Sequence, residues 1–290
     1  MNISFSPCEA SAAVDTRALP DESLNVAAEK PELLPVPSER YFDILGVRFA
    51  AVQIPDVIRR IEMWIKCDRR AHYITVSNVH GVVESQHDMQ VMEALNRSDL
   101  NVPDGMPIVW LGRCSGQRLH RRVYGPELFI DFCHKTQGEG YRHFFYGGAP
   151  EVVKMLVANL KERCPGIKIA GYYSPPFRAL SAEEDEHIIK LINESQADVL
   201  WIGLGCPKQE LWMYAHRQKI SVPAAIGVGQ AFNIYAGSVS QAPRWMREHG
   251  LEWLFRLLQE PKRLGRRYLV YNTEFLLRVT AGAMRSWLGK

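Results

Sequence analysis

The sequence predicts an α/β protein in which helices cover both faces of a mostly parallel sheet. From residue 41 onward, short runs of β-branched and aromatic residues alternate with longer amphipathic segments. That alternation is typical of βα units, whose parallel strands are buried on both faces. The predicted strands cover residues 73–76, 142–146, 167–170, 199–202 and 224–228. Glycine-rich turns follow several of them, as expected where a strand turns tightly into a helix.

Composition predicts a sizeable core, and the residue pattern divides the chain into three parts. The hydrophobic fraction of 47% is ordinary for a folded protein of 290 residues. Residues 1–40 are rich in Ser, Ala, Glu and Pro, so we expect a disordered leader there. Residues 41–240 are expected to form the α/β core, and residues 241–290 a basic amphipathic appendage.

Charge is distributed unevenly along the chain, although the formal net charge is only +3. Residues 1–40 carry three basic and seven acidic side chains, whereas residues 241–290 carry ten basic and four acidic ones. Any attraction to anionic lipid or to a diphosphate is therefore concentrated at the C-terminal end. The nearly neutral remainder does not indicate binding to bulk nucleic acid.

Several common sites and segments are not indicated by the sequence. The six cysteines are scattered without a C-x-x-C pair and the histidines show no H-x-x-x-H pair, so neither a disulfide framework nor a metal site is predicted. The sequence also lacks an Asp-x-Asp motif, a P-loop, a G-x-S-x-G elbow and a G-x-G-x-x-G fingerprint. No apolar run is long enough for a membrane-spanning helix, and the N-terminus lacks the order of a secretory signal. We therefore expect reduced thiols in the cytoplasm and contact with membranes only at their surface.

Glycine turns at the ends of three predicted strands are candidates for binding an anionic ligand. They contain Gly147 with Gly148, Gly203 with Gly205, and Gly229. Backbone N–H groups and the positive end of a helix dipole face the strand ends where open α/β sheets bind ligands. Tight turns also need glycine for backbone reasons alone, which leaves a purely structural role open for each.

Residues 101–107, Asn-Val-Pro-Asp-Gly-Met-Pro, predict a turn that carries a carboxylate. Asp104 is a candidate general base that takes a proton from a substrate hydroxyl. The alternative is that Asp104 only caps the helix that follows. Asn78 stands at the end of the strand that begins at Tyr73 and is expected to face the same edge of the sheet.

The last fifty residues predict two amphipathic helices on either side of Pro261. Leu251, Leu254, Phe255 and Leu258 recur at helical spacing before the proline, and apolar residues recur again after it. Arginines outnumber lysines eight to two in this segment, and a guanidinium fork can grip phosphate bidentately. The segment therefore suits phosphate groups beside a membrane surface, although a helical pair packed on its own core would show the same periodicity.

Taken in order, these motifs resemble the WecG/TagA/CpsF family of bacterial glycosyltransferases over about residues 41–270. They are Asn78, residues 101–110 (NVPDGMPIVW), 122–128 (RVYGPEL), 145–148 (FYGG), 203–210 (GLGCPKQE), 227–232 (GVGQAF) and the block 242–268. The resemblance implies a Rossmann-like core whose C-terminal appendage closes the active site. It also implies inverting transfer of a hexose from a UDP-sugar to a polyprenyl-diphosphate-linked sugar. That reaction would take place at the cytoplasmic face of the cell membrane, without an obligatory metal or other cofactor.

The resemblance also implies roles for individual residues. Asp104 is similar to the family's catalytic base, and Asn78 to a polar contact in the same pocket. Arg256, Arg263 and Arg266 are candidates to neutralise the departing diphosphate, because without a metal cationic side chains must stabilise the charge that develops in the transition state. The implied contacts to the nucleotide sugar are Gln209 and the glycines Gly105, Gly147, Gly148, Gly203, Gly205 and Gly229.

Two other functions and several details stay open at this point. A nucleotide-dependent oxidoreductase or epimerase uses the same kind of sheet, but the missing dinucleotide fingerprint argues against it. A peripheral membrane-binding module without catalysis would need only the basic amphipathic end. Members of the family differ in donor, some using UDP-N-acetylmannosamine and others UDP-glucose or related hexoses, and the residues do not specify which sugar this chain uses. The long N-terminal extension and the Trp-rich C-terminal block look more like the exopolysaccharide glucosyltransferases of the family. The sequence does not specify the linkage, the lipid length, the role of the leader or the arginine that contacts the diphosphate. It also does not specify the oligomeric state, and a homo-oligomer is one possibility.

Overall fold

A computed structural model describes residues 40–288 of the chain. The predicted disordered leader concerns residues 1–40, which lie outside the described part except for Arg40. The side chains of Arg263, Arg267 and residues 285–288 are also outside it.

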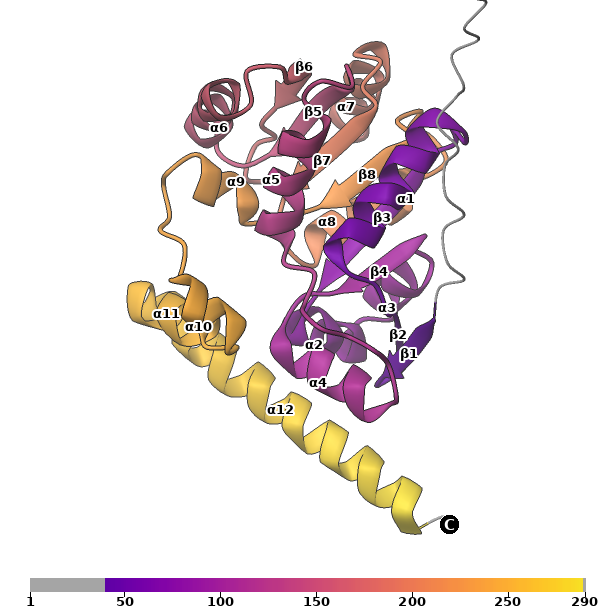
Figure 1. The fold of residues 1–290 in the computed structure, drawn as a ribbon, viewed down its shortest axis with the longest axis vertical. Helices are drawn as coiled ribbons and strands as arrows, with labels where there is room; N and C mark the ends of the chain where they lie inside the picture. Colours follow the sequence, from indigo (N-terminus) through magenta and orange to yellow (C-terminus); the bar gives the residue numbers. More distant parts are fainter. Residues whose placement is uncertain (1–39, 289–290) are drawn as a thin grey trace, which may run out of the picture. The chain divides into compact units, whose positions relative to one another are not determined.

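The centre of the fold is a six-stranded sheet whose paired strands all run parallel (Figure 1). Its strand order is β4-β3-β8-β7-β5-β6. The strands are β3 (His72–Ser77), β4 (Leu100–Pro103), β5 (Arg142–Gly147), β6 (Lys168–Tyr173), β7 (Val199–Gly203) and β8 (Ala224–Gly227). The predicted parallel sheet is thus confirmed, and the five predicted strands correspond to β3, β5, β6, β7 and β8 with small shifts at their ends.

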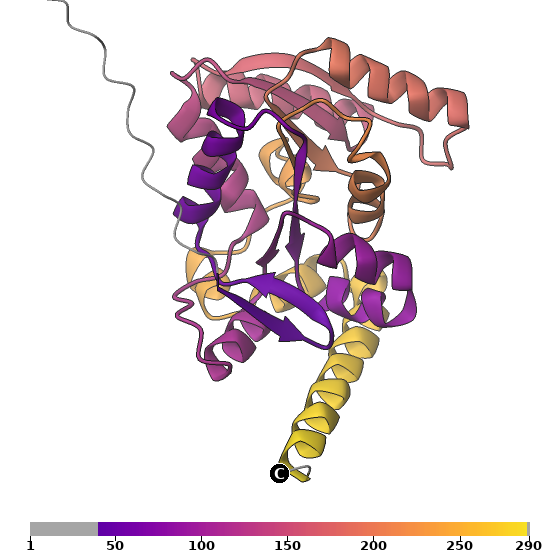
Figure 2. The same ribbon diagram turned by 90° about the vertical axis from the view of Figure 1, so that its right-hand side faces the viewer.

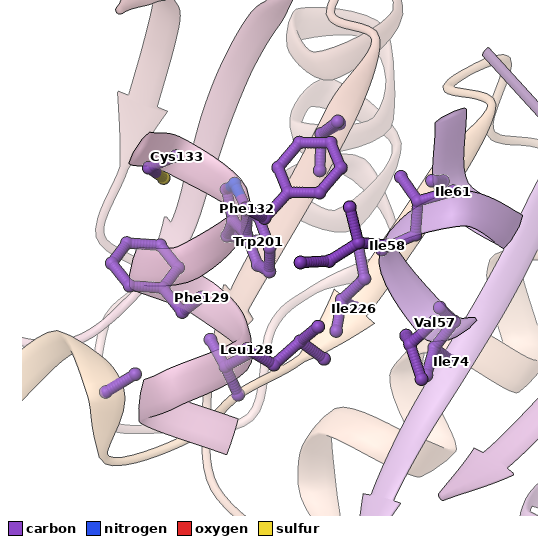
Figure 3. Packing of buried hydrophobic residues seen from close by; sticks show 14 of the residues in the cluster. Val57, Ile58, Ile61, Ile74, Leu128, Phe129, Phe132, Cys133, Trp201 and Ile226 are labelled. Atoms are coloured by element: carbon purple, nitrogen blue, oxygen red, sulfur yellow. The ribbon is translucent and has the colours of Figure 1, made fainter. Parts of the chain in front are cut away.

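Helices cover both faces of this sheet, as predicted. The helices before the C-terminal segment are α1 (Ile54–Lys66), α2 (Val79–His87), α3 (Met89–Asn96), α4 (Met106–Cys114), α5 (Gly125–Thr136), α6 (Pro150–Arg163), α7 (Ala182–Glu194), α8 (Lys208–His216) and α9 (Ala231–Tyr235). On one face, α1, α5, α6 and α9 bury their apolar stripes against the strands; Figure 3 shows Ile58, Phe129 and Phe132 meeting Trp201 and Ile226 there. On the other face, α7 and α8 pack Ile188, Ile192 and Trp212 against the sheet. Burial on both faces explains why the strands read as continuous apolar runs.

Three strands were not predicted from the sequence. The strands β1 (Tyr41–Ile44) and β2 (Val47–Ala50) form a separate antiparallel hairpin, and β4 is one of the two edge strands of the main sheet. In β4, Asn101 and Pro103 interrupt the apolar pattern. Asn101 is nevertheless 4% exposed, because its amide accepts a hydrogen bond from Thr75 Oγ1 at 3.0 Å and donates one to the Arg48 carbonyl at 3.0 Å. These tertiary hydrogen bonds replace the apolar burial that the sequence pattern lacked.

The C-terminal segment forms α10 (Arg244–Glu248), α11 (Glu252–Gln259) and α12 (Pro261–Leu288). The predicted pair of helices with a break at Pro261 is therefore confirmed, and α10 precedes the pair. Helix α12 passes beside α2 (Figure 2), where Phe275 is 3% exposed and the Tyr271 hydroxyl donates to Glu84 Oε1 at 2.6 Å. Within residues 40–288, no helix is both long enough and apolar enough to cross a lipid bilayer.

Candidate active site

The predicted residues that follow the strands lie together at the C-terminal end of the parallel sheet. Ser77 at the end of β3 is paired with Pro103 of β4, and Gly147 at the end of β5 is paired with Gly203 of β7. The segments that follow these residues carry Asn78, Asp104, Gly148 and Gly205. This is the edge at which open α/β sheets bind their ligands.

Asp104 is fixed by the backbone directly after β4. Its N–H donates to the Ser77 carbonyl at 2.8 Å, which continues the pairing of β3 with β4. The N-cap residue of α4 is Gly105, with a φ of 135° that favours glycine, and no side chain caps this helix. The helix-capping alternative for Asp104 is therefore wrong, and its carboxylate points to other partners.

Asn78 lies beside this turn and caps α2. Its Oδ1 accepts hydrogen bonds from the N–H groups of His80 at 3.0 Å and Gly81 at 3.4 Å. A Cβ atom at Gly105 would meet the Asn78 Cβ at 3.7 Å, so the two predicted residues are neighbours. The capping role explains Asn78 structurally, and its exposed side chain leaves the predicted substrate contact as a proposal.

The Asp104 carboxylate is enclosed and holds its proton unusually well. Its side chain is 17% exposed. Burial raises the pKa of Asp104 to about 7, against the opposing positive charge of Arg122. The carboxylate of Glu252 raises this pKa further, Arg256 lowers it, and Glu127 raises it. A carboxylate with a pKa near neutrality is suited to general base catalysis.

Arg122 links this carboxylate to the C-terminal helices. One guanidinium nitrogen, Nη1, lies 3.5 Å from Asp104 Oδ1, and the other, Nη2, donates to Glu252 Oε2 of α11. The hydroxyl of Tyr124 donates to the second oxygen of Glu252 at 2.8 Å, and the Arg122 guanidinium lies 4.2 Å from the Tyr124 ring centre. The side chains of Arg122 and Glu252 are each 13% exposed, so this ion pair is largely shielded from water.

Two further ion pairs hold α10 to the segment before and within α5. Arg247 donates to Glu127, and Arg121 Nη2 lies 3.1 Å from Glu248 Oε1. The Arg247 and Glu127 side chains are mostly buried, whereas those of Arg121 and Glu248 are 54% and 38% exposed. Ion pairs therefore join α10 and α11 to the core beside Asp104, while α12 buries Phe275 in the core beside α2.

The structure distinguishes the three predicted phosphate-binding arginines. Arg256 in α11 acts on Asp104, since its charge lowers the pKa of that carboxyl. Its Nε is buried and has no hydrogen-bond partner among the described residues. Arg266 is exposed on α12. Arg263 also lies in α12, but its side chain is outside the described part.

Packing alone accounts for glycine at two of the predicted nucleotide contacts. A Cβ atom at Gly147 would lie 2.6 Å from the backbone carbon of Gly203, and one at Gly203 would lie 2.6 Å from the Phe232 ring. A Cβ atom at Gly148 would lie at ordinary van der Waals distance from the side chains of Phe232 and Val152. Gly205 differs, because a Cβ there would meet no described atom within 4 Å. Contacts of these glycines with a nucleotide sugar remain proposals.

Gln209 is buried and joins the turn after β7 to the turn after β8. Its Oε1 accepts from the Gly205 N–H at 3.2 Å and lies 3.5 Å from the position of a Cβ at Gly229. Its Nε2 donates to Glu210 Oε1 at 3.0 Å. Burial raises the pKa of Glu210 to about 6. Gln209 thus shapes the turn that carries Gly205, and a direct nucleotide contact for it stays a prediction.

Sequence reasoning gave no role to four residues that surround Asp104: Arg122, Tyr124, Glu127 and Glu252. The first three belong to the motif of residues 122–128. Its guanidinium, phenol and carboxylate groups could have indicated a polar site. Glu252 lies 130 positions from Arg122, and local periodicity says nothing about a pair so distant.

Comparisons with known proteins identify the family of the chain. Residues 42–288 match the model of the glycosyl transferase WecG/TagA/CpsF family. Proteins from Bacillus spizizenii, Bacillus subtilis and Staphylococcus aureus, each named N-acetylglucosaminyldiphosphoundecaprenol N-acetyl-beta-D-mannosaminyltransferase, are 27%, 30% and 29% identical to it. The alignments cover 83%, 62% and 77% of this chain and 93%, 68% and 87% of those proteins, respectively.

The fold, the site and these matches together define a glycosyltransferase. The chain belongs to the WecG/TagA/CpsF family, since the family model matches most of its length. The comparisons do not support the alternatives of an oxidoreductase, an epimerase or a membrane-binding module without catalysis.

Proposed function

We propose that this chain transfers a hexose from a UDP-sugar, with inversion, to a sugar linked to polyprenyl diphosphate. The observation that carries the proposal is the enclosed carboxylate of Asp104, with its pKa of about 7, beside the guanidinium groups of Arg122 and Arg256. In a displacement at an anomeric carbon, a base activates the attacking hydroxyl and cations stabilise the leaving group. Both kinds of group lie at the C-terminal end of this sheet. The names of the relatives, which transfer N-acetylmannosamine to a diphosphoundecaprenol-linked sugar, support the acceptor class.

In this reaction Asp104 acts as the general base. It takes the proton of the acceptor hydroxyl while the hydroxyl oxygen attacks the anomeric carbon of the donor from the face opposite to UDP. The bond between the anomeric carbon and the UDP oxygen breaks, and UDP leaves with the electron pair. A single displacement of this kind inverts the anomeric configuration and needs one carboxylate.

Arg256 is proposed to neutralise the diphosphate of the departing UDP. Its Nε is buried without a hydrogen-bond partner among residues 40–288, so the guanidinium can accept a new anionic partner without breaking a hydrogen bond there. Gly205, Gly229 and Gln209 are proposed to form the nucleotide-sugar side of the site, and Asn78 to contact substrate. Arg263 and Arg266 are proposed as additional cations toward the diphosphate.

The C-terminal helices are proposed to bring the site to the inner face of the cell membrane. Large apolar side chains are exposed on them: Trp245 (59%), Trp253 (43%), Leu258 (72%), Leu269 (72%), Leu276 (61%) and Leu277 (65%). Exposed aromatic and aliphatic groups near arginines suit the boundary between lipid headgroups and acyl chains. The lipid-linked acceptor would then reach Asp104 without leaving the membrane surface.

The first test is transfer to an acceptor that carries N-acetylglucosamine on polyprenyl diphosphate. UDP-N-acetylmannosamine and UDP-glucose are supplied separately, with EDTA in one series and magnesium in another. We expect a longer lipid-linked saccharide from one donor in both series, which identifies the sugar at the same time. If no UDP-sugar yields product in either series, the proposed reaction is wrong; if only the magnesium series does, metal-independent leaving-group stabilisation is wrong.

A further inference from the structure

The contacts of Arg122 with its two carboxylates are unequal. Arg122 makes a short hydrogen bond to Glu252, whereas its distance to Asp104 is 3.5 Å, at the long limit for a hydrogen bond. The Tyr124 hydroxyl fixes the other oxygen of Glu252 at 2.8 Å. The guanidinium of Arg122 is therefore held by Glu252 of α11 and makes only a long contact with the carboxylate of Asp104.

The charges that face Asp104 come from three places in the chain and balance one another. Arg122 precedes α5, Glu127 lies in its first turn, and Glu252 with Arg256 lies in α11. Tyr124 faces the same carboxylate through its phenol. Glu127 has its own partner, because Arg247 of α10 donates to it. Glu252 is thus the carboxylate that competes with Asp104 for Arg122.

We propose that Glu252 is a positioning residue, which holds Arg122 away from Asp104 and so keeps the Asp104 carboxylate free to accept the proton of the acceptor hydroxyl. This inference rests on the proposed function of Asp104 as the base. If Glu252 loses its charge, Arg122 turns fully to Asp104 and forms a close ion pair with it. That pair lowers the proton affinity of Asp104 and occupies the oxygen that the acceptor hydroxyl needs.

The same arrangement makes docking of the C-terminal segment part of catalysis. Glu252 is supplied by α11, while Asp104, Arg122 and Tyr124 belong to the core. A core without α11 would leave Arg122 to pair with Asp104. The base is therefore released only when the C-terminal segment is in place.

The test compares Glu252→Gln with the wild type across pH 5 to 9, measuring kcat/KM for the lipid-linked acceptor. Glutamine keeps the shape of Glu252 and a hydrogen-bond acceptor for Tyr124, but it removes the charge. We expect the acidic limb of the profile to move to lower pH by about one unit, the size typical for losing a nearby like charge. The plateau is expected to fall roughly tenfold, because Asp104 becomes a weaker and partly occupied base.

Glu248→Gln is the matched control. Glu248 also joins the C-terminal segment to the core, through Arg121, but it is 38% exposed and is not among the groups that act on Asp104. Its substitution is expected to leave the midpoint of the acidic limb unchanged. Glu252→Asp, which restores the charge, is expected to return the midpoint to the wild-type value.

An unchanged midpoint in a folded Glu252→Gln protein, with or without a loss of rate, would show that Glu252 only docks the helix. If that variant does not fold, Glu252→Met, which also removes the charge, replaces it: its midpoint should move in the same direction, and no movement overturns the proposal. The proposed function is judged separately. If the wild type transfers sugar and Asp104→Asn is inactive, the proposed function stands. An unchanged midpoint in Glu252→Gln would then contradict only the role of Glu252.

Discussion

The sheet-edge turns and the C-terminal segment build the two sides of the candidate site in different ways. At the sheet edge, close packing of main chain and apolar groups sets the geometry, as where Gly147 meets Gly203 and Gly203 meets Phe232. Beside it, α10 and α11 have no buried residue and are docked by ion pairs to Arg121, Arg122 and Glu127. The first side is rigid because close-packed interiors resist deformation, whereas α10 and α11 contact the core through ion pairs between charged side chains.

This difference assigns separate tasks to the two regions. A closely packed edge can hold Asp104 at a fixed position, since its N–H is part of the pairing between β3 and β4. Helices α10 and α11 are joined to the core by ion pairs and carry Arg256, which is proposed to meet the diphosphate of the leaving group. Removing one region at a time therefore separates their contributions.

Removing residues 241–290 tests the contrast most severely. We expect no measurable sugar transfer, since Glu252 and Arg256 are lost, together with loss of binding to anionic vesicles. The sheet should still unfold cooperatively, because the clusters on its two faces contain no residue of the C-terminal helices. Its melting temperature should fall, because Phe275 of α12 is buried in a third cluster beside α2. Circular dichroism melting and vesicle sedimentation measure these outcomes. A truncated protein that keeps full activity would show that the arginines of this segment do not serve catalysis.

Within the core, Asp104→Asn should remove most of the activity without removing nucleotide binding. We expect kcat to fall by roughly 10³-fold, in the range typical for loss of a general base. Asparagine retains the size of the side chain, so UDP should still raise the melting temperature as it does for the wild type. Weak UDP binding together with a much lower melting temperature would indicate a structural role for Asp104 instead.

In the C-terminal segment, Arg256→Ala should slow the reaction by roughly 10²-fold, as expected when one group that stabilises developing charge is lost. The effect should appear mainly in kcat, because the diphosphate gains charge as the bond to the sugar breaks. Arg278→Ala is the control: Arg278 lies on α12 in an exposed pair with Glu274, and no role is proposed for it at the diphosphate. Equal losses in both variants would mean that only the net charge of the segment matters.

The sequence was sufficient to predict the regions whose structure depends on local patterns. Buried strands such as β5 and β7 read as apolar runs, and the break at Pro261 separates α11 from α12. The edge strand β4 was missed, because Asn101 is buried by hydrogen bonds to distant groups rather than by apolar character. The resemblance gave Asp104 as the base and Arg256, Arg263 and Arg266 as candidate cations, and in the structure the charge of Arg256 acts on Asp104.

The contacts between the two regions could not be predicted in the same way. Arg122 and Glu252 are ordinary surface residues by type, and their pairing depends on how α11 lies against the core. The sequence also could not decide whether Asp104 caps α4. A shift of one residue in the start of the helix decides whether the N-cap is Asp104 or Gly105. Long-range electrostatics, and with it the pKa of the base, therefore belongs to the assembled structure rather than to any motif.

The smallest expected effect concerns stability, and its sign follows from the raised pKa of Asp104. Between the ordinary value of 3.8 and the folded value of about 7, the folded state binds more protons than the unfolded state, so Asp104 makes stability fall as pH rises. At pH 8 the buried charge therefore destabilises the protein. Asp104→Asn removes that charge and should raise the melting temperature by roughly 5 °C at pH 8, corresponding to about 2 kcal/mol. The gain should shrink at pH 5, where the folded protein already holds Asp104 protonated, and an equal gain at both pH values would contradict the assigned pKa.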